Sequence, residues 1–263
     1  METILTFHKE PKVTLVGAGP GDAELITLKG IKALQSANVV LYDALVSEEI
    51  LALIPANIPK LSVGKRAGAH SYSQSEINEL IVEMAYVYGH VVRLKGGDSF
   101  VFGRGGEELE FAAKNGLQTA VVPGISSALA VPAALNIPVT MRGISESFWV
   151  VTGTTMSGKL SDDVALAAKS TATIVILMGL NKLQEIVTLF TQQGKENTPI
   201  AIIQNGTLES QKNIVATVGT VVEKFTATPL GGPAIIVIGE VVAYATDLTN
   251  LMTAARAQIE AYQ

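Results

Sequence analysis

Short apolar runs alternate with glycine-bearing loops and amphipathic stretches along the first half of the chain. The runs are rich in valine, leucine and isoleucine, which is typical of strands that are buried on both faces. They lie at residues 13–16, 38–42, 60–63, 91–94 and 120–122. Helical spacing of apolar residues predicts helices at about residues 25–34, 75–88 and 107–114, and a further one capped by Ser126 or Ser127. This alternation predicts an α/β domain with a mostly parallel sheet.

A different pattern follows in the second half of the chain. Apolar runs predict strands at residues 148–153, 172–177, 200–203 and 234–238, and a helix at about residues 180–193 separates two of them. A strand-like run at 213–217 follows the run at 200–203 after a short polar turn, which favours an antiparallel pair. We therefore predict a mixed sheet in a second α/β domain. The boundary is placed where a long uncharged stretch ends, which gives domains of residues 1–142 and 143–263.

The composition indicates a compact, core-rich protein and excludes several classes of function. Of the 263 residues, 48% are hydrophobic and 16% are charged, which argues against a disordered chain. The formal net charge of −5 argues against a general nucleic-acid binder, so no nucleic-acid partner is expected. The absence of cysteine excludes disulfides and thiolate chemistry. The histidines His8, His70 and His90 are scattered without ligand spacing, so no metal site is expected.

The segment that most resembles a membrane span lies between Lys114 and Arg142 and contains no charge. Prolines, glycines and serines interrupt it, and the long apolar run that a span requires is missing. The first residues of the chain lack the basic region and the apolar core of a secretory signal. We therefore expect a cytoplasmic protein without a membrane partner.

The stretch from Lys95 to Glu108 is the most informative part of the sequence. It follows the predicted strand at 91–94 and is rich in glycine, with charged residues of both signs. Glycine lets the backbone approach a ligand closely, and loops that follow parallel strands form the ligand-binding edge of α/β sheets. The arginines that lie close to glycines are Arg66, Arg93, Arg104 and Arg142. Because the planar fork of arginine suits carboxylates and phosphates, this edge is predicted to bind a polar ligand.

The loop at residues 17–22 offers a second hypothesis, a dinucleotide-binding oxidoreductase. It joins a strand to a helix, and Asp43 ends the next strand at roughly the distance expected of a ribose-binding acid. Against this hypothesis, Asp22 takes the place of the third glycine of the G-x-G-x-x-G pattern, and Pro20 removes one backbone N–H donor. An NAD(P) site is therefore an alternative, beside a tight turn that leads into an acid-capped helix.

Asp43 and Lys65 lie at or just beyond predicted strand ends, which brings both towards the edge that carries Asp98 and Arg104. A lysine and a carboxylate in a cleft exchange protons when burial and neighbours shift their pKa values. Each also has an ordinary structural interpretation, a turn acid for the aspartate and a solvated surface charge for the lysine. The sequence contains no G-x-S-x-G elbow and no Walker loop, so serine nucleophiles and nucleotide hydrolysis have no support.

Several motifs together resemble the uroporphyrinogen-III C-methyltransferases, a family within the tetrapyrrole methylase superfamily, also called class III methyltransferases. The similarity extends from about Lys12 to Val242 and is most specific in the stretch from Arg93 to Glu108. The other motifs lie at residues 16–22, 27–30, 39–46, 122–128, 178–180 and 202–207. The resemblance implies two αβα domains with an active-site cleft between them, and a homodimer.

The resemblance also implies a reaction, the transfer of methyl groups from S-adenosyl-L-methionine (SAM) to C2 and C7 of uroporphyrinogen III. The products would be S-adenosyl-L-homocysteine and, through precorrin-1, precorrin-2, a precursor of sirohaem and cobalamin. No metal is implied. The alternatives are a related methylase that acts on a later corrinoid or a protein side chain, an NAD(P)-dependent oxidoreductase, and a non-catalytic tetrapyrrole-binding protein.

The site residues of the family are carried over to the matching positions of this sequence. Those implied to bind SAM are Pro20, Gly96, Gly97, Asp98, Val101, Ser126, Ser127, Met178 and Gly206. Those implied to carry catalysis are Asp43 as proton acceptor, Lys65 as proton donor, Arg104 and Glu107. Those implied to bind the carboxylate-rich substrate are Arg66, Arg104, Met141 and Arg142.

Three positions carry further expectations. Asp98 is expected to complement the positive sulfonium of SAM. Ser99 stands where the family usually has proline, which is expected to loosen the loop without removing a ligand. Met141 stands where the family usually has histidine, which is expected to change a substrate contact. The length fits the methylase module alone, so oxidation and metal insertion would need another protein.

Overall fold

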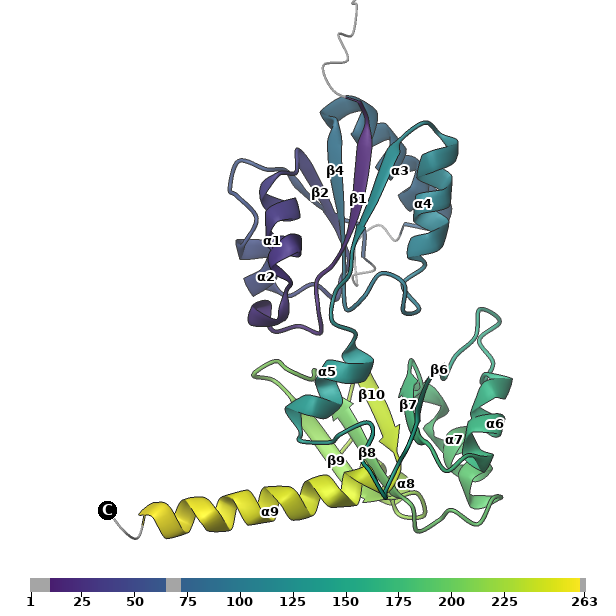
Figure 1. Cartoon of the computed structure of the whole chain (residues 1–263). Helices are drawn as coiled ribbons and strands as arrows, with labels where there is room; N and C mark the ends of the chain where they lie inside the picture. The colour runs from purple at the N-terminus through teal and green to yellow at the C-terminus, as the bar shows by residue number, and fades with distance from the viewer. Residues whose placement is uncertain (1–9, 65–71, 261–263) are drawn as a thin grey trace, which may run out of the picture. The chain divides into compact units, whose positions relative to one another are not determined.

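A computed structural model describes residues 10–64 and 72–260 of the chain. Contacts along the chain divide the protein into two compact units, residues 1–126 and 127–263. Each unit consists of one β-sheet with helices packed against it (Figure 1). The predicted α/β class, with one sheet in each half of the chain, is therefore confirmed.

The two units meet just before α5 (Ser127–Ala134), earlier in the chain than the predicted boundary after Arg142. Ala128 and Val131 of this helix pack in an apolar cluster with strand residues of the second unit. Ile137, in the loop that follows α5, belongs to the same cluster. The part of the uncharged stretch from Ser127 onwards therefore lies with the second unit, because its apolar side chains are buried in that core, whereas β5 at its start belongs to the first.

The first unit is built on a five-stranded parallel sheet with the strand order β3-β2-β4-β1-β5. Its strands are β1 (Lys12–Gly17), β2 (Val39–Tyr42), β3 (Lys60–Ser62), β4 (His90–Lys95) and β5 (Gln118–Val122). β4 lies between β2 and β1, and its residues from Val91 to Lys95 are all buried. The predicted parallel sheet is confirmed, and an apolar run of the sequence marks each of its strands.

Helices cover both faces of the first sheet, with α1 and α2 on one face and α3 and α4 on the other (Figure 1). Their bounds are α1 (Leu28–Gln35), α2 (Glu48–Ala52), α3 (Gln74–Tyr88) and α4 (Gly105–Lys114), and a 3-10 turn, η1 (Ala23–Leu25), precedes α1. Leu34 and Ile50 contribute to the apolar cluster under one face. Ile77 and Ala112 contribute to the cluster under the other face. The sheet is thus buried on both sides, as the continuous apolar runs predict.

The second unit contains a five-stranded mixed sheet with the strand order β6-β7-β10-β8-β9. Its strands are β6 (Phe148–Thr152), β7 (Thr173–Leu177), β8 (Pro199–Gln204), β9 (Lys212–Thr217) and β10 (Ala234–Ile238). β6 and β7 are parallel, whereas β10 is antiparallel to both β7 and β8. The predicted mixed sheet and the predicted antiparallel pair of β8 and β9 are confirmed. β7 and β8 therefore run in the same direction and end at the same edge of the sheet.

Helices also pack against both faces of the second sheet. Besides α5, they are α6 (Asp162–Lys169), α7 (Leu183–Thr191), α8 (Val221–Ala227) and α9 (Val241–Glu260), with a 3-10 turn, η2 (Leu180–Lys182), before α7. One apolar cluster contains Val164, Ile186 and Val221 from α6, α7 and α8. A second cluster contains Val131 and Val241 from α5 and α9. The strands between these clusters are buried on both sides, like those of the first unit.

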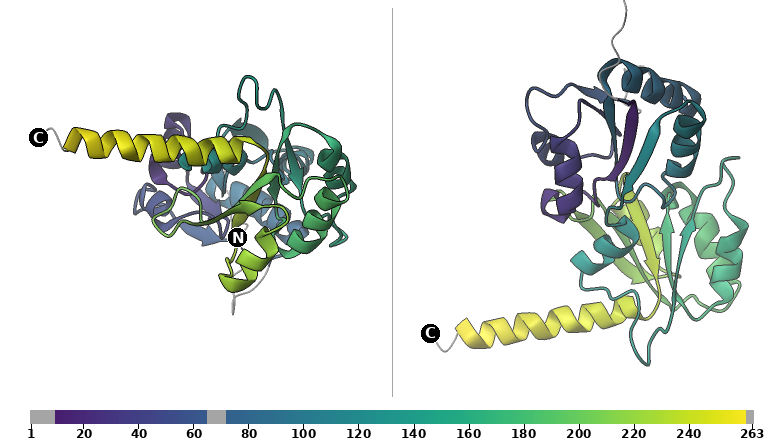
Figure 2. Two further views of the ribbon diagram at one scale, coloured as in Figure 1. Left: turned by 90° about the horizontal axis from the view of Figure 1, so that it is seen from below. Right: turned by 45° about the horizontal axis from the view of Figure 1, so that its top comes forward.

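The C-terminal half of α9 runs clear of the sheet (Figure 2). Leu251 is 69% exposed and Met252 is 54% exposed, so apolar side chains of this helix face solvent. Among the helices of residues 10–64 and 72–260, none is long and apolar enough to cross a membrane. The C-terminal half of α9 therefore exposes two large apolar side chains, Leu251 and Met252.

Candidate active site

The loops that follow β1 and β4 are joined to each other at the carboxyl edge of the first sheet. Gly97 donates its backbone N–H to the carbonyl of Gly19 at 2.7 Å. Gly19 donates its own N–H to the carbonyl of Gly97 at 3.1 Å. The predicted SAM contacts Pro20, Gly96 and Gly97 are therefore brought together on two adjoining loops.

Glycines allow the loops after β1, β4 and β5 to pack directly on one another. A Cβ atom at Gly124 would lie 2.3 Å from the carbonyl oxygen of Gly97. A Cβ atom at Gly17 would lie 2.4 Å from the backbone nitrogen of Gly124. Backbone atoms cannot turn aside as the end of a flexible side chain can, so no larger residue fits at Gly17 or Gly124. The glycine-rich pattern of the sequence is thus explained by close packing of backbones at this edge.

Asp98 ties the loop after β4 to the loop after β5. Its Oδ1 accepts the backbone N–H of Phe100 at 2.9 Å, and its Oδ2 accepts the backbone N–H of Gly124 at 3.0 Å. Hydrogen bonds to a carboxylate are charge-assisted and stronger than those between neutral groups. Both oxygens of Asp98 thus hold backbone groups, a role beyond the expected complement to a sulfonium.

The residues after Asp98 form a closed turn. Gly105 donates its N–H to the carbonyl of Ser99 at 3.0 Å, and Val101 donates its N–H to the carbonyl of Asp98 at 3.2 Å. Ser99 is 1% exposed, and its hydroxyl has no hydrogen-bond partner among the described residues. The structure therefore differs from the expected loosening of the loop. Ser99 packs inside the turn, and the departure from proline leaves a buried hydroxyl group there.

Replacing Ser99 by alanine is expected to stabilise the protein. The change removes a buried hydroxyl without a partner and leaves the Cβ atom in place, which gains about 1 kcal/mol. Urea unfolding followed by circular dichroism measures the gain. Ser73→Ala is the matched control, because the hydroxyl of Ser73 caps α3 by accepting the N–H of Glu76. Loss of this cap should lower the stability by about 1 kcal/mol. A lower unfolding midpoint for Ser99→Ala would contradict the buried, unpaired hydroxyl.

A cluster of charged residues lies directly behind this edge. Arg93 and Lys95 are on the same face of β4, Asp43 follows β2, and Glu108 is on α4. Arg93 Nη2 donates to Asp43 Oδ1 at 2.5 Å, and Arg93 Nε donates to Glu108 Oε1 at 3.2 Å. Lys95 Nζ donates to Glu108 Oε1 at 2.9 Å and lies 3.9 Å from Asp43 Oδ2. Two cations and two carboxylates thus face one another in what we call the charged cluster.

The members of the charged cluster differ in their access to solvent. The side chains of Glu108, Arg93 and Lys95 are 0%, 2% and 5% exposed, whereas that of Asp43 is 27% exposed. Burial lowers the pKa of Lys95 and Arg93 lowers it further, while Glu108 and Asp43 raise it. Asp43 is therefore the member that a ligand can reach, and the other three lie behind it.

Lys95 and Glu108 belong to the charged cluster, although no role was predicted for either of them from the sequence. The sequence does indicate a buried ion pair here, because Arg93 and Lys95 lie in a strand expected to be buried on both faces. A charged side chain in such a strand needs a partner of opposite charge. The carboxylate that pairs with these two cations could not be identified from the sequence, because the neighbouring acids Glu107 and Glu108 are both candidates. Only the start of α4 at Gly105 decides that Glu108 faces the sheet.

Arg104 and Glu107 form a bidentate ion pair at the start of α4. Arg104 Nε donates to Glu107 Oε1 at 2.9 Å, and Arg104 Nη2 donates to Glu107 Oε2 at 2.5 Å. Hydrogen bonding between the two side chains raises the pKa of Arg104 and lowers the pKa of Glu107. About half of each side chain is exposed. The guanidinium therefore stands at the surface already bound to a carboxylate.

Met178 and Gly206 lie at the edge of the second sheet where β7 and β8 end. Met178 has a φ of 55° and is 51% exposed, and its carbonyl accepts the hydroxyl of Thr154 at 2.7 Å. Gly206 is buried, and a Cβ atom there would lie 2.2 Å from a methyl carbon of Val131. The two predicted SAM contacts of the second unit are thus brought to one edge of its sheet. A left-handed conformation at a methionine is unusual, and the hydrogen bond from Thr154 to its carbonyl holds this backbone in place.

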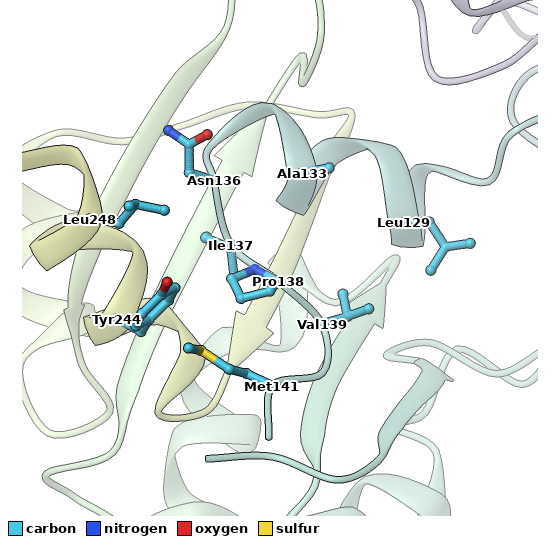
Figure 3. A pocket seen from close by; sticks show the side chains of 9 residues that line it. All are labelled: Leu129, Ala133, Asn136, Ile137, Pro138, Val139, Met141, Tyr244 and Leu248. Carbon is cyan, nitrogen blue, oxygen red and sulfur yellow. The ribbon is translucent and has the colours of Figure 1, made fainter. Parts of the chain in front are cut away.

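Met141 lines an apolar pocket of about 460 Å³ in the second unit (Figure 3). The residues that line this pocket are Leu129, Ala133, Asn136, Ile137, Pro138, Val139, Met141, Tyr244 and Leu248. None of them is charged, so the pocket does not suit a substrate rich in carboxylates. Arg142 follows in an exposed turn, in which Met141 and Ser145 exchange backbone hydrogen bonds of 2.8 Å.

Two predicted site residues, Lys65 and Arg66, lie outside the described residues. Ser126 ends the first unit, and Ser127 begins α5 of the second. Within residues 10–64 and 72–260, no group of three or more histidine, cysteine, aspartate or glutamate side chains is placed to hold a metal ion. The predicted residues that the structure brings together are therefore those of the first sheet edge and, separately, Met178 and Gly206.

The loop at residues 17–22 does not lead into the helix N-terminus that a dinucleotide site uses. It leads into η1, and α1 begins only at Leu28. Asp22 caps η1 by accepting the backbone N–H of Glu24 at 2.8 Å. A carboxylate thus occupies the place where a pyrophosphate would bind. The NAD(P) hypothesis is therefore not favoured.

Residues 12–222 match the tetrapyrrole (corrin/porphyrin) methylases. The chain belongs to this methylase family. Over 233 residues the tetrapyrrole methylase is 49% identical to the uroporphyrinogen-III C-methyltransferase of Methanocaldococcus jannaschii. The match covers 88% of this chain and 96% of the relative. Over 234 residues it is 48% identical to siroheme synthase 2 of Aeromonas hydrophila. This match covers 88% of this chain and 49% of the relative.

A solved structure is similar to the tetrapyrrole methylase as well. It is the crystal structure of uroporphyrin-III C-methyl transferase from Thermus thermophilus complexed with S-adenyl homocysteine, with a TM-score of 0.77 and 38% identity. The match covers 89% of this chain and 99% of the Thermus chain. The predicted tetrapyrrole methylase fold is therefore confirmed.

Proposed function

We propose that this tetrapyrrole methylase transfers methyl groups from SAM to C2 and C7 of uroporphyrinogen III, through precorrin-1 to precorrin-2. The observation that carries the proposal is the 49% identity with a uroporphyrinogen-III C-methyltransferase, over 96% of the length of that relative. The product would feed the biosynthesis of sirohaem, cobalamin and related tetrapyrroles.

The loops at the carboxyl edge of the first sheet suit the methyl donor. SAM supplies an activated methyl group when it is bound. Gly96 and Gly97 have no side chains, so their backbone is the surface that a ligand meets, with Pro20 on the adjoining loop. Asp98 holds this backbone in place through Phe100 and Gly124. The remaining proposed donor contacts are Val101, Ser126, Ser127, Met178 and Gly206.

Asp43 is the proposed proton acceptor. Methylation of a pyrrole carbon ends with the loss of a proton, which a nearby base takes up. Arg93 and Lys95 face Asp43 from the buried side, while 27% of the Asp43 side chain is open to solvent. A carboxylate that buried cations hold on one side and that is exposed on the other suits a base that must contact a bound substrate. Lys65 remains the proposed proton donor.

Arg104 is the proposed binding site for a carboxylate of the substrate. Its bidentate contact with Glu107 has the fork geometry in which guanidinium groups bind carboxylates in general. A substrate carboxylate would therefore replace Glu107, which is half exposed and can be hydrated when it is released. Arg66 and Arg142 are further proposed substrate contacts, whereas the apolar pocket around Met141 does not support the contact predicted at that residue.

Arg104→Ala is expected to raise KM for uroporphyrinogen III roughly tenfold or more, because it removes a charge-assisted bidentate contact. The affinity for S-adenosylhomocysteine, measured by calorimetry, should stay as in the unaltered protein. Lys114→Ala is the matched control, since Lys114 lies on the same helix and forms an exposed ion pair with Glu110. An unchanged KM for Arg104→Ala would remove Arg104 from the proposed substrate contacts.

The reaction is tested by incubating the protein with uroporphyrinogen III and SAM that carries a labelled methyl group. We expect a dimethylated product and two equivalents of S-adenosylhomocysteine for each tetrapyrrole. Transfer of label to a later corrinoid alone would replace the proposed substrate by another of the same class. Binding of uroporphyrinogen III without any transfer would point to a non-catalytic tetrapyrrole-binding protein.

A homodimer is proposed as well, and apolar surface on the second unit supports it. Tyr244 and Leu248 of α9 line the apolar pocket, and Leu251 and Met252 continue exposed along the same helix. Such a surface is usually covered by another protein surface. Light scattering after gel filtration measures the mass in solution, and a monomer at micromolar concentration would overturn this proposal. The cytoplasmic location remains a prediction.

A further inference from the structure

Glu108 is the most deeply buried member of the charged cluster. Its side chain is 0% exposed, and one oxygen, Oε1, accepts all of its hydrogen bonds. The donors are Arg93 Nε at 3.2 Å, Lys95 Nζ at 2.9 Å and Gln74 Nε2 at 3.2 Å. The other oxygen, Oε2, is buried without a partner in the part of the chain that the structure describes. Glu108 is out of reach of solvent, and its charge acts on the two cations that it contacts and, less directly, on Arg104, whose pKa it helps to raise.

We propose that Glu108 is a positioning residue for the methyl transfer, which keeps Lys95 charged so that two cations, Arg93 and Lys95, face Asp43. The proposal rests on the proposed function, because Asp43 has a proton to accept only if the protein methylates a pyrrole carbon. Glu108 does not touch the substrate in this scheme. It acts through the two buried cations that stand between it and Asp43.

The first step of the argument concerns the balance of charges. If Lys95 lost its proton, the single guanidinium of Arg93 would face two carboxylates. Asp43 would keep the 2.5 Å contact of its Oδ1 with Arg93 but would lose the second cation, which lies 3.9 Å from its Oδ2. The electrostatic environment of Asp43 therefore depends on the charge of Lys95.

The second step concerns what keeps Lys95 charged. The charged groups of the described residues that face Lys95 are Arg93 on its own strand, Asp43 after β2, Glu108 on α4 and, more remotely, Glu107. Burial and Arg93 both lower the pKa of Lys95, and Glu108 is the strongest of the groups that raise it. Without the charge of Glu108, Lys95 would lose its proton at a lower pH.

Two substitutions move this balance in opposite directions. Glu108→Gln keeps the shape and one acceptor oxygen but removes the charge. The alkaline limb of the pH profile of kcat should then move to lower pH, so that the ratio of kcat at about pH 9 to kcat at about pH 7 falls about threefold or more. Lys95→Arg carries a cation that does not titrate in this range, so the same limb should move to higher pH or disappear.

Control variants separate this role from a structural one. Gln74→Ala removes a hydrogen bond to the same oxygen without changing any charge, and should keep the pH profile of the unaltered protein. Glu108→Asp restores the charge and should return the limb towards its original position, even where kcat is lower. KM for uroporphyrinogen III and the affinity for S-adenosylhomocysteine should stay close to those of the unaltered protein in every variant.

The outcomes are distinct. Lower kcat in both Glu108→Gln and Lys95→Arg, with an alkaline limb that does not move, would overturn the proposal and leave Glu108 a structural residue. If Glu108→Gln does not fold, as judged by circular dichroism, Lys95→Arg is compared with the unaltered protein instead. An alkaline limb that does not move in Lys95→Arg would again overturn the proposal. If the unaltered protein fails to methylate uroporphyrinogen III, the proposed function fails first, before any variant is compared.

Discussion

Gly124→Ala is expected to lose most of the methyltransferase activity and part of the stability of the protein. The added Cβ atom would lie 2.3 Å from the carbonyl oxygen of Gly97 and 2.7 Å from backbone carbons of Gly17, so the loops that carry them must separate. Overpacking of this kind costs about 1–3 kcal/mol of stability. A displacement of about 1 Å at a site costs roughly 100-fold in rate. Urea unfolding and kcat/KM with uroporphyrinogen III measure the two effects.

Gly106→Ala is the control for this experiment. Gly106 lies in α4, and a Cβ atom there meets nothing within 4 Å. Alanine favours a helix over glycine by about 0.5–1 kcal/mol, so this variant should be slightly more stable and as active as the unaltered protein. Full activity of Gly124→Ala would mean that the direct packing of the loops has no part in the reaction.

Asp43→Asn is expected to lower kcat by roughly 100-fold to 10,000-fold, which is the range that a general base contributes. Asparagine has almost the same shape and keeps an acceptor for Arg93, so the buried guanidinium retains a partner. Calorimetry should find unchanged affinity for S-adenosylhomocysteine, because Asp43 is not among the proposed donor contacts. Steady-state rates with uroporphyrinogen III measure the loss.

Glu110→Gln is the matched control for Asp43→Asn. Glu110 is a carboxylate of the same unit that forms an exposed ion pair with Lys114, so its charge should not matter for turnover. A kcat for Asp43→Asn within a few-fold of the unaltered protein would contradict the role of Asp43 as proton acceptor.

The strands could be predicted from the sequence more completely than the helices. Strands that are buried on both faces, such as β1 and β10, are continuous apolar runs and need no partner to be recognised. α2 has five residues, too few to display a helical period. The far half of α9 packs on no core, so nothing imposes an apolar face that a sequence pattern could reveal. The unit boundary was missed because α5 is apolar all round, and the sequence alone does not say which core takes it up.

The edge of the site was predictable, whereas the charged cluster was not. Glycines directly after a strand, as at Gly96 and Gly97, indicate a loop where backbones come close, and a single chain segment carries that signal. The contact of Asp43 with Arg93 joins residues far apart in the chain. It exists because β2 and β4 are neighbours, an order that the spacing of the strands along the chain does not determine.

The reciprocal hydrogen bonds between Gly19 and Gly97 form an isolated antiparallel bridge just beyond the parallel β1–β4 ladder. The conformational entropy of these two loops is therefore lost when the sheet folds, and a ligand that arrives later does not have to immobilise them. The affinity for the ligand is therefore linked to the stability of β1 and β4. A bound ligand should slow the opening of β1 and β4, which would appear as slower amide hydrogen exchange in both strands, while a mutation that frays either strand should weaken binding from a distance.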